Sequence, residues 1–277
     1  MKKGKLIVIL GQSGSGKTTL ANEVILTGVI LFDNKTLPHG IAPWEEEYPK
    51  ALQELTTDLN NTSFYARKYV TRDIRKDDVG VIHATKEEMD KVCDVVLSGY
   101  KENDYYGFNT KEIINQIDNG KYPVIVTGFM QTLQLLLRRF YELGRLEDIY
   151  VVGIRSLLYD LDHYNKLEQN RYGKENINEH IRESAKRRFE ESRLLARQYY
   201  YFGGMESETG VFDYVVKNIR FKYGRDIDLR KEGSFIYNIA SRFDGVRTKE
   251  QLDKIMELIH CNLNEFTPVQ EDEIKRI

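Results

Sequence analysis

The stretch that most constrains the fold is a glycine-rich octapeptide directly behind an apolar run. Gly11–Thr18 reads GQSGSGKT and follows Leu6–Leu10. Its three glycines let the backbone wrap around a polyphosphate and present successive N–H groups to the oxygens. Lys17 adds a charge for the β- and γ-phosphates, Thr18 offers a hydroxyl to Mg²⁺, and the following helix points its positive end at the same anion. A strand, such a loop and a helix in this order predict a phosphate-binding P-loop.

Length and charge narrow the possible functions. With 277 residues, the chain fits one large domain or two small ones. A formal net charge of -2 supplies no basic field, so a nucleic-acid partner is not expected. Cys93 and Cys261 lack metal-ligand spacing and are interpreted as reduced thiols. No apolar run approaches the roughly 20 residues of a membrane span, and Met1–Lys3 leads into a strand rather than a signal peptide, so a cytoplasmic protein is expected.

Apolar runs alternate with helical patterns along the chain. Continuous apolar strands are expected at 122–127, 149–154 and 212–216. Helices are expected at 110–120, 131–143 and 248–259, the last with a capping box at its start. Strands that are apolar on both faces belong to a parallel sheet covered by helices, with the ligand beyond the carboxyl ends of the strands. The fold class expected is α/β, a P-loop NTPase three-layer sandwich with a mostly parallel sheet.

Shorter patterns predict the connecting segments. A surface helix is expected at 44–59, a strand at 64–70, a helix at 86–96 and a turn at Tyr105–Gly107. Arg155–Asn178 is polar and irregular, which predicts a mobile basic flap before a long helix. The mixed stretch 219–245 has no clear period and no functional interpretation.

Two groups of arginines are candidates for holding phosphate. Arg72 and Arg75 lie three apart in a charged loop, and guanidinium groups can each fork onto phosphate oxygens. The long helix carries Arg182, Arg187, Arg188 and Arg193. Taken alone, each group is better explained by solvated charges that pair with neighbouring acidic residues.

The ordered set of motifs resembles the guanylate kinase family of P-loop phosphotransferases, over roughly Lys5 to Asn218. Gly11–Thr18 looks like the donor loop of that family, and Thr71–Arg75 is similar to its acceptor-loop TRxxR. Tyr105–Gly107 resembles its YYG segment. The stretch from Arg187-Arg188 to Phe212–Asn218 resembles its lid-end helix and its FDYVVxN strand.

The resemblance implies an enzyme with ATP as donor, Mg²⁺ as cofactor and a small phosphate monoester as acceptor, acting as a monomer or homodimer. It implies catalytic roles for Lys17, Arg171, Arg187 and Arg188. It implies ATP binding by Gly11, Gln12, Ser13, Gly14, Ser15, Gly16, Lys17, Thr18, Thr19 and Asn218, with Thr18 also on the metal. It implies acceptor binding by Lys68, Arg72, Arg75, Asp78, Tyr106 and Phe108.

The resemblance also implies a division of the chain into four parts. The P-loop core is expected to combine 1–33, 120–155 and 195–218. An inserted acceptor-binding segment is expected at 34–119 and a mobile lid at 156–194. A C-terminal extension at 219–277 is expected to pack on the core.

The departures from the family fall on the positions that read guanine. Lys68 stands where the family has a serine, Leu97 where it has a glutamate, and Phe108 where it has Ser or Thr. Thr127–Phe129 replaces an Asp-x-Asp segment. A site that hydrogen-bonds one base discriminates through such polar groups. We therefore expect the phosphate-binding residues to be kept and the specificity for guanine to be lost.

The hypothesis is therefore a kinase that transfers the γ-phosphate of ATP to a nucleoside monophosphate, GMP, dGMP or another, and releases the diphosphate. One alternative is a kinase of the same fold with a non-guanine acceptor, such as another deoxynucleotide or ribose bisphosphate, which Leu97 and Phe108 favour. A second is a catalytically silent nucleotide-binding module, which the complete Gly11–Thr18 loop disfavours. A third, a polynucleotide 5′-end kinase, is disfavoured by the net charge of -2.

Overall fold

The structure is a computed structural model that describes residues 3–18, 20–22, 63–74, 78–99, 103–155, 161–172, 178–202, 211–218, 237–242 and 248–266. The predicted helix at 44–59 and the candidate residues Thr19 and Arg75 lie outside these ranges. For Arg171 and Asn218 only the backbone is described.

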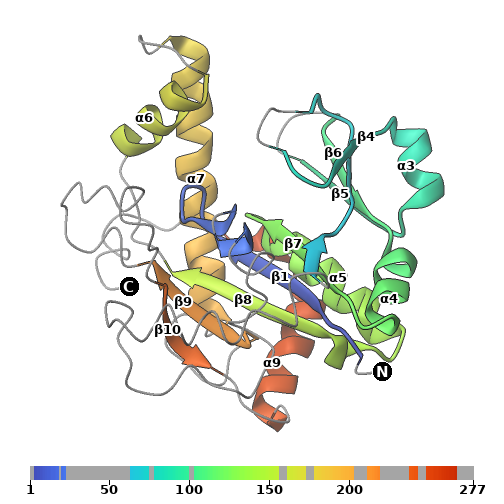
Figure 1. Cartoon of the computed structure of the whole chain (residues 1–277). Coiled ribbons are helices and arrows are strands. Elements are labelled where there is room, and N and C mark those ends of the chain that lie inside the picture. Colours follow the sequence, from blue (N-terminus) through green and yellow to red (C-terminus); the bar gives the residue numbers. More distant parts are fainter. Residues whose placement is uncertain are drawn as a thin grey trace, which may run out of the picture. The chain divides into compact units, whose positions relative to one another are not determined.

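The described strands form two sheets (Figure 1). The larger sheet has the strand order β10-β9-β8-β1-β7-β2, and the smaller one the order β4-β3-β6-β5. The strands of the larger sheet are β1 (Leu6–Gly11), β2 (Ser63–Tyr65), β7 (Tyr122–Thr127), β8 (Ile149–Arg155), β9 (Tyr214–Asn218) and β10 (Tyr237–Arg242). Those of the smaller sheet are β3 (Lys68–Val70), β4 (Val81–His83), β5 (Val95–Ser98) and β6 (Tyr105–Phe108).

The larger sheet has the parallel, fully buried character that its apolar strands predict. β2 pairs in parallel with β7, and β8 pairs in parallel with β9. Every residue of β1 is buried, and in β7 all but Val126 are buried. β10 is added antiparallel to β9, within a stretch for which the sequence pattern predicted no element. The α/β class with a mostly parallel sheet is confirmed.

The helices of the described residues are α3 (Lys86–Val92), α4 (Thr110–Asp118), α5 (Met130–Glu142), α6 (Leu161–Tyr172), α7 (Glu179–Tyr201) and α9 (Lys249–His260), with 3₁₀ turns η1 (Leu146–Asp148) and η3 (Leu263–Glu265). The helices predicted at 131–143 and 248–259 are confirmed within two residues. Thr248 and Gln251 make the reciprocal capping box at the start of α9. None of the described helices is long and apolar enough to cross a bilayer.

The strand predicted at 64–70 is two strands in different sheets. β2 ends at Tyr65 and pairs with β7, whereas β3 begins at Lys68 and pairs with β4 and β6. Between them Ala66 donates its backbone N–H to Val124, and Arg67 is exposed. An alternation of residues along one chain cannot reveal that the two halves pair with different strands.

The helix and the turn predicted around 86–107 are also corrected. α3 stops at Val92, and the β-branched pair after it starts β5. The segment Tyr105–Gly107 is not a turn but part of strand β6, which pairs with β3 and β5. A Cβ on Gly107 would lie 2.8 Å from atoms of both Cys93 and Met89, so this glycine allows α3 to approach the sheet.

The segment Arg155–Asn178, predicted to be irregular, contains α6. This helix packs beside α7 (Figure 1). Tyr164 on α6 is fully buried and donates its hydroxyl to Ser192 of α7 at 2.6 Å. A polar sequence therefore becomes helical because tertiary partners from α7 satisfy its buried groups.

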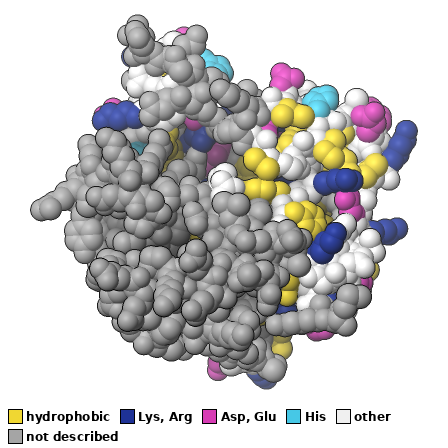
Figure 2. Space-filling view, viewed as in Figure 1, with side chains coloured by type: hydrophobic (Ala, Val, Ile, Leu, Met, Phe, Trp, Pro, Cys, Tyr) yellow, Lys and Arg dark blue, Asp and Glu magenta, His cyan; other side chains and the backbone are white. Residues whose placement is uncertain are grey.

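The chain divides into two compact units. The first comprises Met1–Ile9, Thr18–Val126 and Gln131–Tyr150, and the second comprises Leu10–Lys17, Thr127–Met130 and Val151–Ile277. The described part of the face in Figure 2 carries Lys, Arg, Asp and Glu side chains among hydrophobic ones. The division into four parts that the family resemblance implies stays a prediction.

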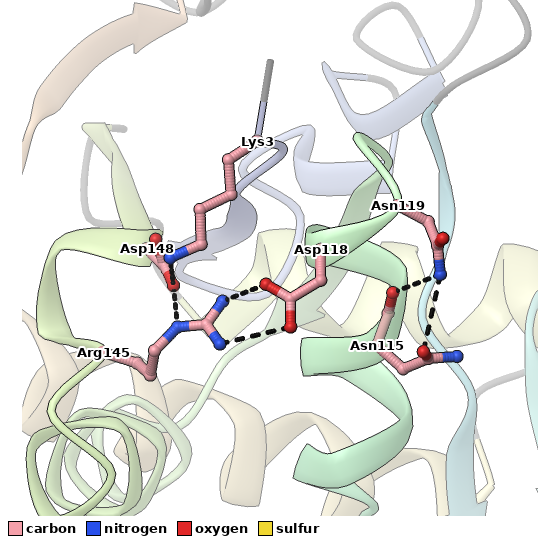
Figure 3. Close-up of polar contacts among 6 residues, drawn as sticks. All are labelled: Lys3, Asn115, Asp118, Asn119, Arg145 and Asp148. Carbon is pink, nitrogen blue, oxygen red and sulfur yellow. Dashed lines mark hydrogen bonds and ion pairs between the residues drawn. The ribbon is translucent and has the colours of Figure 1, made fainter. Parts of the chain in front are cut away.

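An ionic network ties together three segments of the first unit (Figure 3). The carboxylate of Asp148, which is 3% exposed, contacts Nζ of Lys3 at 2.9 Å and Nε of Arg145. The two Nη atoms of Arg145 donate to the carboxylate of Asp118, which is 49% exposed. Hydrogen bonding and the charge of Arg145 keep the pKa of Asp118 below its usual range. The start of the chain, the end of α4 and the turn before β8 are thereby joined.

Candidate functional site

The octapeptide after β1 has the backbone that a P-loop requires. Gly14 and Gly16 adopt φ angles of 79° and 88°, a left-handed region that favours glycine. Residues 13–16 form a turn and a bend, and helical residues begin at Lys17. A Cβ on Gly11 would lie 2.7 Å from Oγ of Ser15, so the loop closes tightly at its first residue as well. The strand, loop and helix predicted from the sequence are present in this order.

Lys17 and Thr18 are the candidates in this loop for contact with a nucleotide and its metal. Lys17 donates from Nζ to the carbonyl oxygen of Gln12 at 2.5 Å, so its ammonium group lies over the loop. Thr18 is exposed at the end of the loop. Among the described residues no group of three or more His, Cys, Asp or Glu side chains could hold a metal. Mg²⁺ that enters with ATP needs no such cage, because phosphates and water supply most of its ligands. The residues present therefore fit Mg²⁺ brought by the nucleotide.

The segment after β7 lies against the start of the loop. A Cβ on Gly128 would lie 3.7 Å from the carbonyl oxygen of Gly11. Thr127 is 7% exposed, and its hydroxyl accepts a hydrogen bond from the N–H of Phe129 at 3.1 Å. Thr127, Gly128 and Phe129 thus lie beside the P-loop and carry no carboxylate.

The first turns of α6 contact the P-loop directly. A Cβ on Gly14 would lie 2.9 Å from Leu167 and 3.8 Å from Nε2 of His163. These two side chains stand four residues apart and share one helical face. The glycine at position 14 therefore serves both its left-handed backbone and the close approach of α6.

Arg188 of α7 reaches the P-loop from the other helix of this pair. Its Nη1 donates to Oγ of Ser13 at 2.5 Å, and its Nε lies 2.7 Å from Oε1 of Glu168 on α6. Oγ of Ser184 donates to Oε2 of the same carboxylate at 2.5 Å. Glu168 is 1% exposed, and the Arg188 side chain is 18% exposed. Of the predicted lid arginines whose side chains the structure describes, this one hydrogen-bonds the P-loop.

Arg187 makes a local pair on its own helix. Its Nε lies 3.3 Å from Oε1 of Glu191, and its Nη2 donates to Oγ of Ser184 at 3.4 Å. Burial raises the pKa of Glu191 to about 7, against the opposing charges of Arg187 and Lys17. The solvated i,i+4 pair expected from the sequence is thus a partly buried one.

α7 is anchored to the strand that precedes the loop. The hydroxyl of Tyr199 donates to the carbonyl oxygen of Leu10, and its ring stacks on Phe212 with centroids 4.8 Å apart. A Cβ on Gly153 would lie 2.9 Å from Phe212 and 3.1 Å from Tyr199, so a glycine in β8 makes room for both rings. The helix that carries Arg188 is thereby fixed to the end of β1.

The arginine loop in the first unit is held by its own aspartate. Nη1 and Nη2 of Arg72 donate to the two carboxylate oxygens of Asp78 at 2.7 and 2.9 Å, and the side chains are only 10% and 12% exposed. Burial alone would lower the pKa of Arg72, but hydrogen bonding and the charge of Asp78 raise it, and Tyr106 adds to this. Arg72, Asp78 and Tyr106, named separately from the sequence, therefore form one cluster.

The remaining candidates for acceptor binding divide by burial. Lys68 is half-buried at the start of β3. Phe108 is 2% exposed and Leu97 is 8% exposed, both within the smaller sheet. These two apolar side chains thus contribute to the core of this sheet.

Sequence reasoning missed Glu168, His163 and Tyr199. The spacing of His163 and Leu167 is a helical signal, which was overlooked because the segment was interpreted as irregular. Glu168 carried no signal of its own, since a single glutamate among polar residues looks like a solvated one. Tyr199 follows the helical period of α7, but nothing in the sequence reveals its backbone partner.

No protein-family model and no curated protein matches the chain. Among solved structures, the guanylate kinase from Anaplasma phagocytophilum is similar over 71% of this chain and 87% of that chain, with 14% identity and a TM-score of 0.35. The reaction is therefore inferred from the residues of the site.

Proposed function

We propose that the protein is an ATP-dependent phosphotransferase that moves the γ-phosphate of ATP to a nucleoside monophosphate, GMP, dGMP or another, and releases ADP and the diphosphate. The observation that carries the proposal is the hydrogen bond from Arg188 to Ser13 of a complete P-loop. A module that only binds nucleotide needs the loop alone. A partly buried guanidinium brought to that loop from a second helix can stabilise the charge of a transferring phosphoryl group.

The chemistry requires cations more than acid–base groups. The transition state spreads negative charge over the equatorial oxygens of the transferring group, and positioned cations and backbone N–H groups stabilise it. Lys17 and Arg188 supply two such cations, with Arg187 and Arg171 proposed to complete the set. The acceptor phosphate is already an anion, so no general base is needed. Mg²⁺, when bound, neutralises the β- and γ-phosphates, and Thr18 would hold it.

The acceptor phosphate is proposed to bind at the Arg72 cluster. A guanidinium with two donors committed to Asp78 is fixed in plane and keeps further N–H groups for an anion. Arg75, Tyr106 and Lys68 are proposed to complete this site. A small phosphate monoester fits such a grip, because the contacts are made to phosphate rather than to a base.

A second candidate acceptor lacks guanine. Leu97 and Phe108 are buried and apolar, so they offer no hydrogen bonds to a purine edge. A site is highly specific for one base when any other base would leave polar groups of the site without hydrogen bonds. A different deoxynucleoside monophosphate or a phosphorylated sugar such as ribose bisphosphate is therefore the specific alternative.

One experiment tests the reaction and the acceptor together. The protein is incubated with ATP, Mg²⁺ and a panel of nucleoside monophosphates plus ribose bisphosphate, and ADP release is followed for each. We expect turnover with at least one acceptor, and a Lys17→Ala variant should lose at least about 100-fold in kcat. Lys166→Ala is the matched control, because this lysine is 73% exposed on α6. ATP binding without turnover of any acceptor would identify a nucleotide-binding module instead.

A further inference from the structure

Glu168 is a buried carboxylate that the motifs leave unexplained. It lies on α6 at 1% exposure, with a hydroxyl of α7 on one oxygen and a guanidinium of α7 at the other. Removing a carboxylate from water is costly unless charge and hydrogen bonds compensate. Ser184 and Arg188 together supply that compensation.

Arg188 joins this carboxylate to the donor loop. Its Nε edge lies at Glu168, and its Nη1 donates to Ser13. Because the guanidinium is planar and rigid, an anion that fixes the Nε edge also fixes the direction of the Nη atoms. Without it, a side chain with several rotatable bonds would have to be ordered at the loop at the cost of its own entropy.

The contrast with Arg187 shows that this arrangement is specific. Arg187 pairs with Glu191 one turn along the same helix. The partner of Arg188 comes from a different helix, and that helix also touches the loop through Leu167 beside Gly14. One helix therefore contacts the donor loop and orients the arginine that reaches it.

We infer that Glu168 is a positioning residue, which holds the guanidinium of Arg188 toward the phosphates of a nucleotide bound at the P-loop. This inference rests on the proposed function. It gives α6 a second role besides packing on the P-loop, because a carboxylate of this helix orients the guanidinium of Arg188.

The test is a double-mutant cycle of Glu168→Gln and Arg188→Ala. The kcat of transfer and the dissociation constant of MgATP are measured for the wild type, both single variants and the double variant. We expect Glu168→Gln alone to lower kcat or MgATP affinity by about 10- to 100-fold, as for the loss of a close, partly buried ion pair. In the double variant the loss should equal that of Arg188→Ala within about threefold. Independent effects that multiply would overturn the inference.

A second readout separates positioning from a structural role. Added guanidinium ion should restore part of the activity of Arg188→Ala, because Glu168 can hold the free cation. It should not restore the Glu168→Gln/Arg188→Ala variant. Equal rescue of both would refute a positioning role. Asp162→Asn on α6 is the matched control, since this carboxylate is 74% exposed and pairs only locally with Lys166. Glu168→Asp replaces Glu168→Gln if the latter melts at a much lower temperature.

The two proposals fail in different ways. If the wild type phosphorylates no acceptor, the proposed function fails, and the cycle is read from MgATP binding and from binding of guanidinium ion to Arg188→Ala. If acceptors are phosphorylated but the cycle shows no coupling, only the role of Glu168 is withdrawn. If neither turnover nor coupling in MgATP binding is found, both are withdrawn.

Discussion

Arg145 offers a direct test of how burial sets the contribution of an ion pair to stability, because it pairs with one buried and one exposed carboxylate. Asp148 is 3% exposed and Asp118 is 49% exposed, and both contact the same guanidinium (Figure 3). Removing one partner of a buried pair leaves an uncompensated charge. We predict that Asp148→Ala lowers the free energy of unfolding by about 3 kcal/mol, near the low end for such sites, since Arg145 keeps Asp118 and Lys3 can reach water.

The assay is urea denaturation followed by circular dichroism, with Asp118→Ala as the matched control. The midpoint should fall for Asp148→Ala at an unchanged slope, and much less for Asp118→Ala. Raising the salt concentration should abolish the small effect of the control but not that of Asp148→Ala, because exposed pairs are screened. Equal effects of the two variants, or complete loss of the Asp148→Ala effect in salt, would refute this reasoning.

Three further predictions concern pH, the P-loop and the smaller sheet. The pKa of Glu191 is raised by burial from 4.5 to about 7, so the folded state binds this proton more tightly than the unfolded one. Stability should therefore fall as pH rises from about 5 to 8, by at most about 3 kcal/mol from this group, and Glu191→Gln should remove that part of the pH dependence in urea titrations. Gly14→Ala should weaken MgATP binding about 5- to 30-fold by calorimetry, whereas Gly144→Ala, with a similar positive φ and open space around it, should leave binding unchanged. Gly107→Ala should lower the melting temperature through overpacking of about 1–3 kcal/mol, and Gly128→Ala, whose new carbon meets no atom closer than 3.7 Å, should lower it much less.

Much of the larger sheet could be predicted from sequence because its strands are short apolar runs with clear limits. The strand at 122–127 and the helix that follows it were placed within a residue, since Gly128 and Gly144 interrupt the pattern at both ends of that helix. The smaller sheet was predicted poorly, because its strands are only three or four residues long. Such short strands show no clear alternation of apolar residues, and their pairing joins segments that are not adjacent in the sequence. Gly107 illustrates the reason: a glycine after two tyrosines suggests a turn, and only the packing of α3 explains it as part of a strand.

The candidate site likewise has a part that local sequence predicts and a part that depends on tertiary contacts. The strand, turn and helix of the P-loop could be predicted from residue types and spacing, because the conformation of such a loop is a local property. Arg72 and Arg188 could be named as candidates, but a charge run alone favoured solvated side chains. Their burial beside Asp78 and Glu168 depends on contacts between separate segments, which residue spacing does not encode.

The sequence by itself determined the backbone of the P-loop, since its glycines stand where the chain adopts a left-handed conformation. It also determined the α/β class through the period of its apolar residues. Only the tertiary structure decided that polar α6 is a helix, that Glu168 is buried in it, and that Arg188 rather than Arg187 reaches Ser13. The physical reason is that backbone conformation at glycine is a local property, whereas the cost of a buried charge is met by partners elsewhere in the chain.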